Sequence, residues 1–210
     1  ELRNPLGIVK ATVQVMEGEF KNQTGLKEYT TVICEQVDRG NRVIKELLDF
    51  GRPSKPIVSP VDLNSLLESI LIFTYPMLRQ NKIELEKQFE PDLPLLNIDM
   101  DRIKQVFVNL ILNAIQAMQG GGKLIIRSVD NKDTIDVHFI DSGSGIEPQD
   151  LHHVFDPFYT TKDDGAGLGL SISYQIMQMH GGKIRVSDTS SLGTTMTVSI
   201  PHPPLPTENQ

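Results

Sequence analysis

The segment Asn109-Leu-Ile-Leu-Asn113-Ala-Ile-Gln116 places three amide side chains at helical spacing, and three glycine-containing motifs follow it along the chain. These are Asp141-Ser-Gly143-Ser-Gly145, Gly165-Ala-Gly167-Leu-Gly169-Leu170 and Gly193-Thr194-Thr195. Each motif alone has an ordinary explanation, as a solvated helix face, a surface turn or the start of a strand. Their order and spacing together predict one domain that brings an amide stripe, a carboxylate and glycine-rich backbone to a single site.

The residues around these motifs alternate between helical and strand patterns. A helix capped by Asp62 or Asn64 is predicted through about Arg79, and a strand at residues 83–89. Asp99 is expected to cap the next helix. The buried face of that helix comprises Ile103, Val106, Phe107, Leu110, Ile111, Ala114, Ile115 and Met118. Further strands are predicted at 123–128, 134–141, 183–187 and 194–200, with a helix at about 169–180. This pattern is typical of an α/β sandwich, with helices over a mixed sheet.

The first fifty residues have a different pattern, that of two helices with apolar seams. The seams comprise Leu2, Leu6, Val9, Val13, Met16 and Phe20 in the first helix, and Tyr29, Ile33, Val37, Gly40, Ile44, Leu47 and Phe50 in the second. A polar turn at residues 21–25 joins them into a hairpin. Because two helices alone bury little apolar surface, we expect the hairpin to pair with a second copy as a dimeric four-helix bundle.

Prolines separate the two patterns. Pro53, Pro56 and Pro60 follow Gly51 closely, and proline both lacks an amide donor and restricts the preceding residue. We therefore predict a helical hairpin over residues 1–52, a linker over 53–60, an α/β domain over 61–201 and a tail over 202–210. The fold class is α+β.

Composition excludes several classes of protein. The net charge of −7 and the pI near 5.2 argue against a general affinity for nucleic acid. The single Cys34 fits a reducing compartment, and no apolar run reaches the roughly 20 residues that span a bilayer. We expect a cytoplasmic segment without membrane contact. Since the sequence starts without Met, we expect a fragment, and a longer parent could carry a membrane anchor.

The amide stripe and Asp141 suggest specific chemistry. Asn109, Asn113 and Gln116 lie within roughly 60° of one another around a helix, and an amide oxygen is a suitable ligand for Mg²⁺. Asp141 follows a strand and precedes a glycine turn, where its carboxylate can accept a hydrogen bond from the amino group of adenine. That contact would discriminate adenine from guanine, which has a carbonyl at the corresponding position.

The glycines of residues 165–170 precede a helix, so free amides and the positive end of the helix dipole can face phosphate. Their spacing is neither GxxxxGK[ST] nor the dinucleotide GxGxxG. The preceding segment Phe155-Asp-Pro-Phe158-Tyr-Thr160-Thr161-Lys162 supplies aromatic side chains that can anchor a lid and a lysine that can reach a terminal phosphate. An ordinary loop with buried aromatics would have the same composition.

Taken together, the motifs resemble the catalytic core of a sensor histidine kinase, over about residues 1–200. Residues 109–116 match the N box, 141–146 the first glycine box, 155–158 the F box, 165–170 the second glycine box and 193–195 a further glycine motif. The runs Asn-Ala-Ile-Gln-Ala-Met and Pro-Phe-Tyr-Thr-Thr-Lys resemble the nitrogen-regulatory subtype. The resemblance implies a Bergerat or GHKL-type ATP-binding domain, as in the gyrase and heat-shock ATPases.

The resemblance also implies roles for individual residues. Asn113 would ligate Mg²⁺, Asn109 would support metal and phosphates, and Asp141 would recognise adenine. The implied ATP-binding residues are Asn109, Asn113, Gln116, Asp141, Gly143, Gly145, Ile146, Phe158, Thr161, Lys162, Gly165, Ala166, Gly167, Leu168, Gly169, Leu170, Thr194 and Thr195. Ala166 departs from the commoner Thr or Ser, which leaves backbone contacts only at that position.

Glu1-Leu-Arg-Asn4-Pro5 resembles the family's H box without its first residue, the phosphate-accepting histidine. By resemblance, Glu1 would orient or deprotonate that imidazole, Asn4 would position water for dephosphorylating a partner aspartate, and Pro5 would bend the helix. None of the five histidines present lies on the hairpin, so the chain as given should bind ATP without phosphorylating itself at the usual site.

The function that follows is an ATP-dependent protein-histidine kinase core, acting as a homodimer and passing phosphate to a response-regulator receiver domain. An ATPase of the same superfamily that drives conformational change is one alternative, although it would have no use for the H-box remainder. A noncatalytic dimer or scaffold that binds a regulator is the other, and absence of ATP affinity would favour it.

Overall fold

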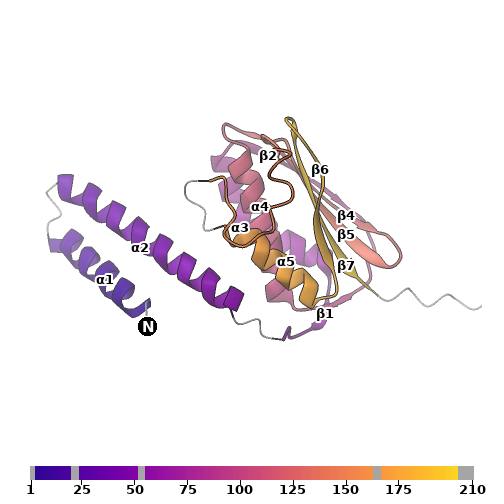
Figure 1. The fold of residues 1–210 in the computed structure, drawn as a ribbon, viewed down its shortest axis with the longest axis horizontal. Coiled ribbons are helices and arrows are strands. Elements are labelled where there is room, and N and C mark those ends of the chain that lie inside the picture. The colour runs from indigo at the N-terminus through magenta and orange to yellow at the C-terminus, as the bar shows by residue number, and fades with distance from the viewer. Residues whose placement is uncertain (1–2, 20–23, 52–54, 163–166, 203–210) are drawn as a thin grey trace, which may run out of the picture. The chain divides into compact units, whose positions relative to one another are not determined.

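The computed structural model describes residues 3–19, 24–51, 55–162 and 167–202, and it divides into two compact units at Pro53/Ser54 (Figure 1). In the first unit, α1 (Arg3–Glu19) and α2 (Thr24–Gly51) form the predicted helical hairpin. Val13 and Val37 are buried between the helices, and the Lys10 ammonium pairs with the Asp38 carboxylate at 2.6 Å.

The hairpin leaves much of its apolar surface exposed. The exposed apolar side chains are Ile8, Val9, Val15, Met16, Tyr29, Val32, Ile33 and Leu47. Several of these belong to the seams predicted from the sequence, so the two helices of one chain do not bury those seams. Thr30 is buried instead, at a position that the apolar spacing did not indicate.

The second unit is the α/β sandwich expected from the sequence, and that part of the fold prediction is confirmed. Its elements are β1 (Ser59–Val61), α3 (Leu63–Gln80), β2 (Ile83–Phe89), β3 (Leu96–Ile98), α4 (Met100–Ala117), β4 (Gly122–Asp130), β5 (Thr134–Asp141), α5 (Gly169–Met179), β6 (Lys183–Ser190) and β7 (Gly193–Pro201). Of the two proposed caps for α3, Asp62 is the observed one, since its Oδ1 accepts from the Ser65 amide at 3.1 Å. Asp99 caps α4 through the Arg102 amide at 3.2 Å.

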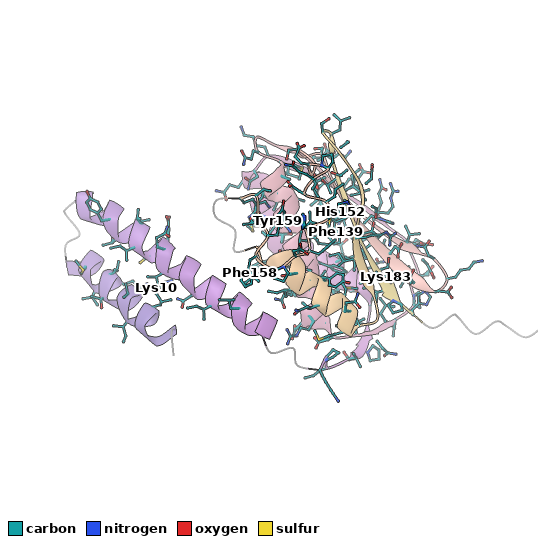
Figure 2. The ribbon with its side chains drawn as sticks, viewed as in Figure 1. Lys10, Phe139, His152, Phe158, Tyr159 and Lys183 are labelled. Atoms are coloured by element: carbon teal, nitrogen blue, oxygen red, sulfur yellow. The ribbon has the colours of Figure 1, made fainter. Side chains whose placement is uncertain are left out.

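Five strands form a mixed sheet in the order β2-β4-β5-β7-β6, and α3, α4 and α5 cover one of its faces (Figure 1). Only the β2–β4 pair is parallel. Along β5, Ile135, Val137 and Phe139 point to the helices, and Phe139 packs on Phe107 of α4 with ring centroids 5.4 Å apart. Figure 2 labels Phe139 within this core. The same alternation puts Asp141 on the helix side of the sheet and Asp136 on the opposite side.

The sequence did not predict β1 and β3, which pair with each other in a separate two-stranded sheet. Three residues are too few to show an alternating pattern, and Pro60 argues against a strand. β1 begins at Ser59, so the predicted linker over residues 53–60 overlaps the start of the second unit. None of the helices within the described ranges is long and apolar enough to cross a membrane.

Candidate functional site

The three amides of α4 lie along one face of the helix, toward the start of α5. The Asn109 amide group donates to Ser173 Oγ at 3.0 Å, and Ser173 Oγ donates to the Gly169 carbonyl at 2.9 Å. A Cβ atom at position 169 would lie 2.4 Å from Asn109 Oδ1, so only glycine permits this approach. The first predicted amide is thereby fixed against the amino-terminal turn of α5.

The other two amides, those of Asn113 and Gln116, bind the ammonium group of a lysine in the same chain. The Lys162 ammonium donates to Gln116 Oε1 at 2.6 Å and to Asn113 Oδ1 at 3.4 Å. Thr160 Oγ1 accepts from the Lys162 backbone amide at 3.1 Å and steadies the turn that carries this lysine. The stripe therefore presents two amide oxygens that accept from a cationic group, and oxygen is the type of ligand that Mg²⁺ prefers.

Asp141 ends β5 on the helix side and is buried, with 8% of its surface exposed. Its Oδ1 accepts from the Gly143 amide at 2.8 Å and from the Thr194 amide at 3.3 Å. Within the part of the chain that the structure describes, no hydrogen bond ends on Oδ2. The carboxylate is thus held rigidly by one oxygen, while the other is available to a donor from a ligand.

The environment shifts the protonation equilibria of Asp141 and Lys162 toward their neutral forms. Burial raises the pKa of Asp141, against the opposing effect of its two backbone hydrogen bonds and of the Lys162 charge. Desolvation lowers the pKa of Lys162, and the Asp141 carboxylate opposes that shift. Perturbed groups of opposite charge at one site are characteristic of ligand-binding positions.

The first glycine motif turns the chain back over the end of α4. The Ser144 amide donates to the Ala117 carbonyl at 3.2 Å, and the Ile146 amide donates to Thr189 Oγ1 at 2.9 Å. A Cβ atom at Gly143 would lie 2.8 Å from the Ala117 carbonyl oxygen, which accounts for the glycine there. The motif therefore connects α4, β5 and β6 around Asp141.

The second glycine motif leads into α5. Gly165 and Ala166 lie outside the described residues, so their predicted contacts stay predictions. Gly167 adopts a φ of +69°, and its carbonyl accepts from the Phe158 amide at 2.9 Å. Figure 2 labels Phe158 in this loop, where 60% of its surface is exposed. Among the described residues, no side chain caps the start of α5. Amides in its first turn are therefore available to an anion.

Not every predicted contact can be made by a side chain. Leu168 is completely buried, so only its backbone can reach a ligand. Thr194 is opposite Asp141 in the ladder and lies on the helix side of the sheet. Thr195 is opposite Ile140 and points to the other face of the sheet, so the structure does not bring its side chain to the site. That prediction ignored the alternation of the strand.

The side chains of the two predicted catalytic residues, Glu1 and Asn4, are not among those that the structure describes. Glu1 lies outside the described residues, and Asn4 lies in α1. The remaining predicted positions, Thr161 and Leu170, flank Lys162 and the start of α5, and Thr161 is exposed.

The sequence did not indicate Ser173 and Thr189, whose hydroxyl groups hydrogen-bond residues of the site. Thr189 Oγ1 bonds both the Ile146 amide and Thr194 Oγ1, the latter at 3.2 Å. This placement depends on an irregularity between Val186 and Asp188 that shifts the register of β6 against β7. Ser173 could have been found, because it is four residues beyond Gly169 and so on the same helix face.

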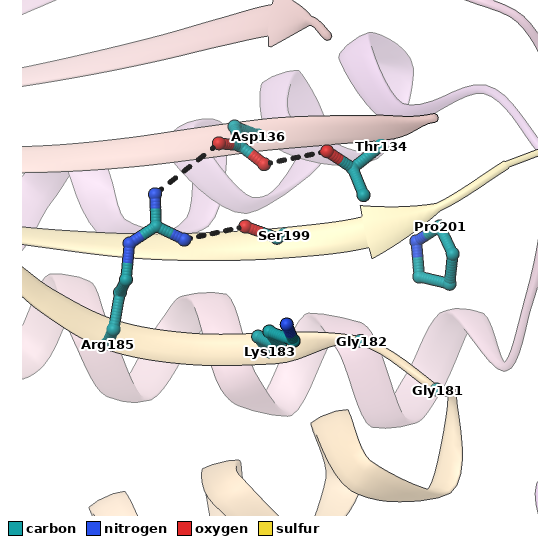
Figure 3. A pocket seen from close by; sticks show the side chains of 8 residues that line it. All are labelled: Thr134, Asp136, Gly181, Gly182, Lys183, Arg185, Ser199 and Pro201. Carbon is teal, nitrogen blue, oxygen red and sulfur yellow. Dashed lines mark hydrogen bonds and ion pairs between the residues drawn. The ribbon is translucent and has the colours of Figure 1, made fainter. Parts of the chain in front are cut away.

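A separate polar pocket lies on the other face of the sheet (Figure 3). In it, Arg185 bonds Ser199 Oγ at 3.0 Å and approaches the Asp136 carboxylate at 3.7 Å, and Thr134 bonds the same carboxylate at 3.3 Å. These groups satisfy one another. Among the described residues, no group of three His, Cys, Asp or Glu side chains could hold a metal ion. The amide stripe is therefore the better cation-binding candidate.

Known proteins give two family matches along the chain. Residues 1–56 match the His Kinase A (phospho-acceptor) domain, and residues 98–204 match the histidine kinase-, DNA gyrase B- and HSP90-like ATPase family. The second match covers the amide stripe and all the glycine motifs.

Individual relatives agree with these matches. The chain is 34% identical over 204 residues to the signal transduction histidine-protein kinase AtoS of Escherichia coli (strain K12), and 33% identical over 201 residues to the sensor histidine kinase ZraS of the same strain. It spans 96% of its own length in both comparisons, but 33% and 43% of the respective relatives.

Among solved structures, histidine kinase ThkA in complex with response regulator protein TrrA matches the whole chain and 60% of its own, at 28% identity and a TM-score of 0.73. The order of hairpin and α/β domain, the placement of the motifs around Asp141 and the family matches agree. The chain belongs to the sensor histidine kinases of two-component systems.

Proposed function

We propose that this chain is the catalytic core of an ATP-dependent protein-histidine kinase. The observation that carries the proposal is the convergence of Asp141, the amide stripe of α4 and Lys162 beside the uncapped start of α5. A buried acceptor, oxygen ligands for a cation and donors for an anion are the three requirements of a magnesium nucleotide.

Different residues would bind different parts of the nucleotide. Asp141 Oδ2 would accept from the adenine amino group, with Thr194 and the glycine turn beside it. The amides at the start of α5 and the Lys162 ammonium would hold phosphate oxygens. Asn113 would ligate Mg²⁺ and Asn109 would support it. Lys162 would leave the oxygens of Asn113 and Gln116 when it bonds phosphate. Bound Mg²⁺ supplies charge neutralisation for the leaving diphosphate.

In the parent protein, a histidine expected immediately before Glu1 would be the acceptor. Its imidazole nitrogen forms a bond to the γ-phosphorus as the bond to the β,γ-bridging oxygen breaks, releasing ADP, and Glu1 would take the imidazole proton. The phosphoryl group then passes to an aspartate oxygen of a receiver domain, and the imidazole nitrogen is freed. Asn4 would position the water that later hydrolyses the aspartyl phosphate.

The partners follow from the hairpin. Its exposed apolar side chains, with Ile8 67% and Tyr29 72% exposed, would be covered by a second hairpin in a homodimeric four-helix bundle. The relative ThkA is in complex with a response regulator protein, which supports a receiver domain as the phosphate acceptor here. An ATPase that forms no phosphohistidine would have no use for the H-box remainder at residues 1–5. A noncatalytic scaffold would not need a buried carboxyl with a raised pKa at Asp141.

Asn113→Ala tests the assigned metal site. We expect wild-type ATP affinity, measured by isothermal titration, to increase with added Mg²⁺, and the variant to lose most of that increase, about tenfold. Affinity without Mg²⁺ should change little, because the amide does not contact adenine. Met100→Ala, at an exposed position on the opposite side of the same helix, is the control. A variant that retains the full Mg²⁺ response would remove Asn113 from the metal site.

Lys162→Met tests the phosphate-binding role of the lysine. We expect ATP to bind about 5- to 20-fold more weakly, because a charge-assisted bond to phosphate is lost, while adenosine binds as before. Lys162→Arg keeps the charge and should retain most of the affinity. Equal losses for ATP and adenosine would show that the lysine supports the fold of the site rather than the phosphates.

A further inference from the structure

Asp99 joins the end of the linker to the helix that carries the amide stripe. Its Oδ1 accepts from the Arg102 amide at 3.2 Å and caps α4, while its Oδ2 accepts from the Ile57 amide at 2.9 Å. Each carboxylate oxygen thus serves a different segment. Burial alone would raise the pKa of Asp99, but the bonds from Ile57 and Arg102 and the nearby positive charge hold this pKa below its ordinary value.

The strand register explains why this bond matters. In the β1–β3 ladder, Ser59 is opposite Ile98, so Ile57 lies two residues beyond the first paired position. The backbone beyond Ile98 turns into α4 and cannot continue the ladder. The Asp99 carboxylate therefore extends the attachment of the chain from Ser59 back to Ile57.

Side-chain packing does not hold this segment. Ile57 is 85% exposed and Val58 is 54% exposed, so both apolar side chains face solvent. Little apolar burial is available to stabilise their position. The backbone hydrogen bond to Asp99 is therefore an important restraint on residues 57 and 58.

Asp99 is itself held by α5. Its amide donates to His180 Nε2 at 3.0 Å, and His180 Nδ1 lies 2.8 Å from the Ile176 carbonyl oxygen. A carbonyl oxygen only accepts, so Nδ1 carries the proton and Nε2 is the acceptor. The other end of α5 begins at Gly169, beside Asn109. The linker is thus attached to both helices that border the nucleotide site.

We propose that Asp99, with His180 behind it, is a positioning residue that latches Ile57 and Val58 to the nucleotide-binding domain and so shortens the connecting span toward the hairpin by these two residues. The proposal rests on the kinase function proposed above. Release of Ile57 and Val58 would add about 7 Å of reach. Phosphoryl transfer depends on orientation at this scale, so a looser span lowers the rate at which the domain presents the γ-phosphate to the hairpin.

Asp99→Asn separates the latch from the helix cap. Asparagine caps helices as well as aspartate, so its single oxygen can keep the Arg102 bond, while its amide nitrogen cannot accept from Ile57. Ile57→Pro removes the donor and leaves Asp99 unchanged. Asp62→Asn is the matched control, because Asp62 caps α3 and both of its oxygens bond Ser65.

The first measurement is amide hydrogen exchange by NMR on the chain of 210 residues. We expect the Ile57 amide to be protected in the wild type and in Asp62→Asn, and to exchange about tenfold faster in Asp99→Asn. The amides of β1 and β3 should keep their protection. A wild-type Ile57 amide that exchanges freely, or one that Asp99→Asn does not change, would overturn the latch.

The second measurement is autophosphorylation of the full-length parent protein. We expect Asp99→Asn and Ile57→Pro to lower kcat about fivefold and to leave KM for ATP within twofold, with Asp62→Asn like the wild type. An unchanged kcat in both latch variants would refute the positioning role. Failure of the wild type to bind ATP would instead refute the proposed function, and the exchange result would still report on the latch.

Discussion

Asp141→Asn should weaken ATP binding about 10- to 100-fold and leave the domain at least as stable at neutral pH. The loss corresponds to a charge-assisted hydrogen bond of about 1.5–3 kcal/mol to the adenine amino group. Asparagine can still accept the Gly143 and Thr194 bonds through one oxygen, but its amide nitrogen would face the adenine amino group, donor against donor. Isothermal titration with ATP and GTP measures the loss and the change in base preference.

The stability part follows from the raised pKa of Asp141. A carboxyl whose pKa is higher in the folded state binds fewer protons in the unfolded state, so the free energy of unfolding falls as pH rises through the folded pKa. The ionised carboxylate is therefore a cost at neutral pH that asparagine removes. Urea denaturation at pH 7 and at pH 4.5 measures this effect. The free energy of unfolding of the wild type should increase relative to that of the variant as the pH falls.

Asp136→Asn is the control for this experiment. Both aspartates lie on β5 and both are buried, but Asp136 lies on the opposite face with Arg185 and Thr134 (Figure 3). We expect its ATP affinity to match the wild type. If Asp141→Asn binds ATP normally, the assignment of the adenine site is wrong.

Gly193→Ala should destabilise the α/β domain by about 2–4 kcal/mol. Gly193 adopts a φ of +140°, and a Cβ atom there would lie 1.9 Å from the Asp141 carbonyl oxygen. Both backbone strain and overlap with a rigid neighbouring strand contribute to this cost. For a domain of this size, we expect the midpoint of thermal unfolding to fall by about 5–15 °C, measured by calorimetry.

Gly181→Ala separates the two contributions. Gly181 also has a positive φ, +66°, but its nearest neighbour to a Cβ atom is Pro201 Cγ at 3.8 Å. Strain without overlap should cost about 1 kcal/mol. Equal destabilisation by the two substitutions would show that close approach to Asp141 is not what requires glycine at position 193.

Local patterns along the chain were sufficient to predict most of the secondary structure. β2 and β5 begin and end at the predicted residues, and Asp99 caps α4 as expected, because alternation and capping are properties of a few consecutive residues. β1 and β3 were missed for the same reason. Each is three residues long, and its strand partner is the other, across more than thirty residues of intervening chain.

In the candidate site, too, local patterns were predictable and contacts that depend on strand register were not. Asn109, Asn113 and Gln116 could be assigned to one helix face from their spacing, and the order of the glycine motifs indicated a nucleotide fold. Thr195 was included because it adjoins Thr194, yet the pleat points it away from Asp141. The supporting role of Thr189 depends on a register shift in β6 that no local pattern reveals.

The sequence by itself determined which residue types meet at the site, since motif order and helical spacing are encoded along the chain. Only the tertiary structure decided how they meet: the Lys162 ammonium on the amide oxygens, the bond from the Thr194 amide to Asp141, and the bond from Ile57 to Asp99. The residues joined are 46 and 49 positions apart in the first case, 53 in the second and 42 in the third. Their geometry depends on strand register and helix packing, which no short segment contains.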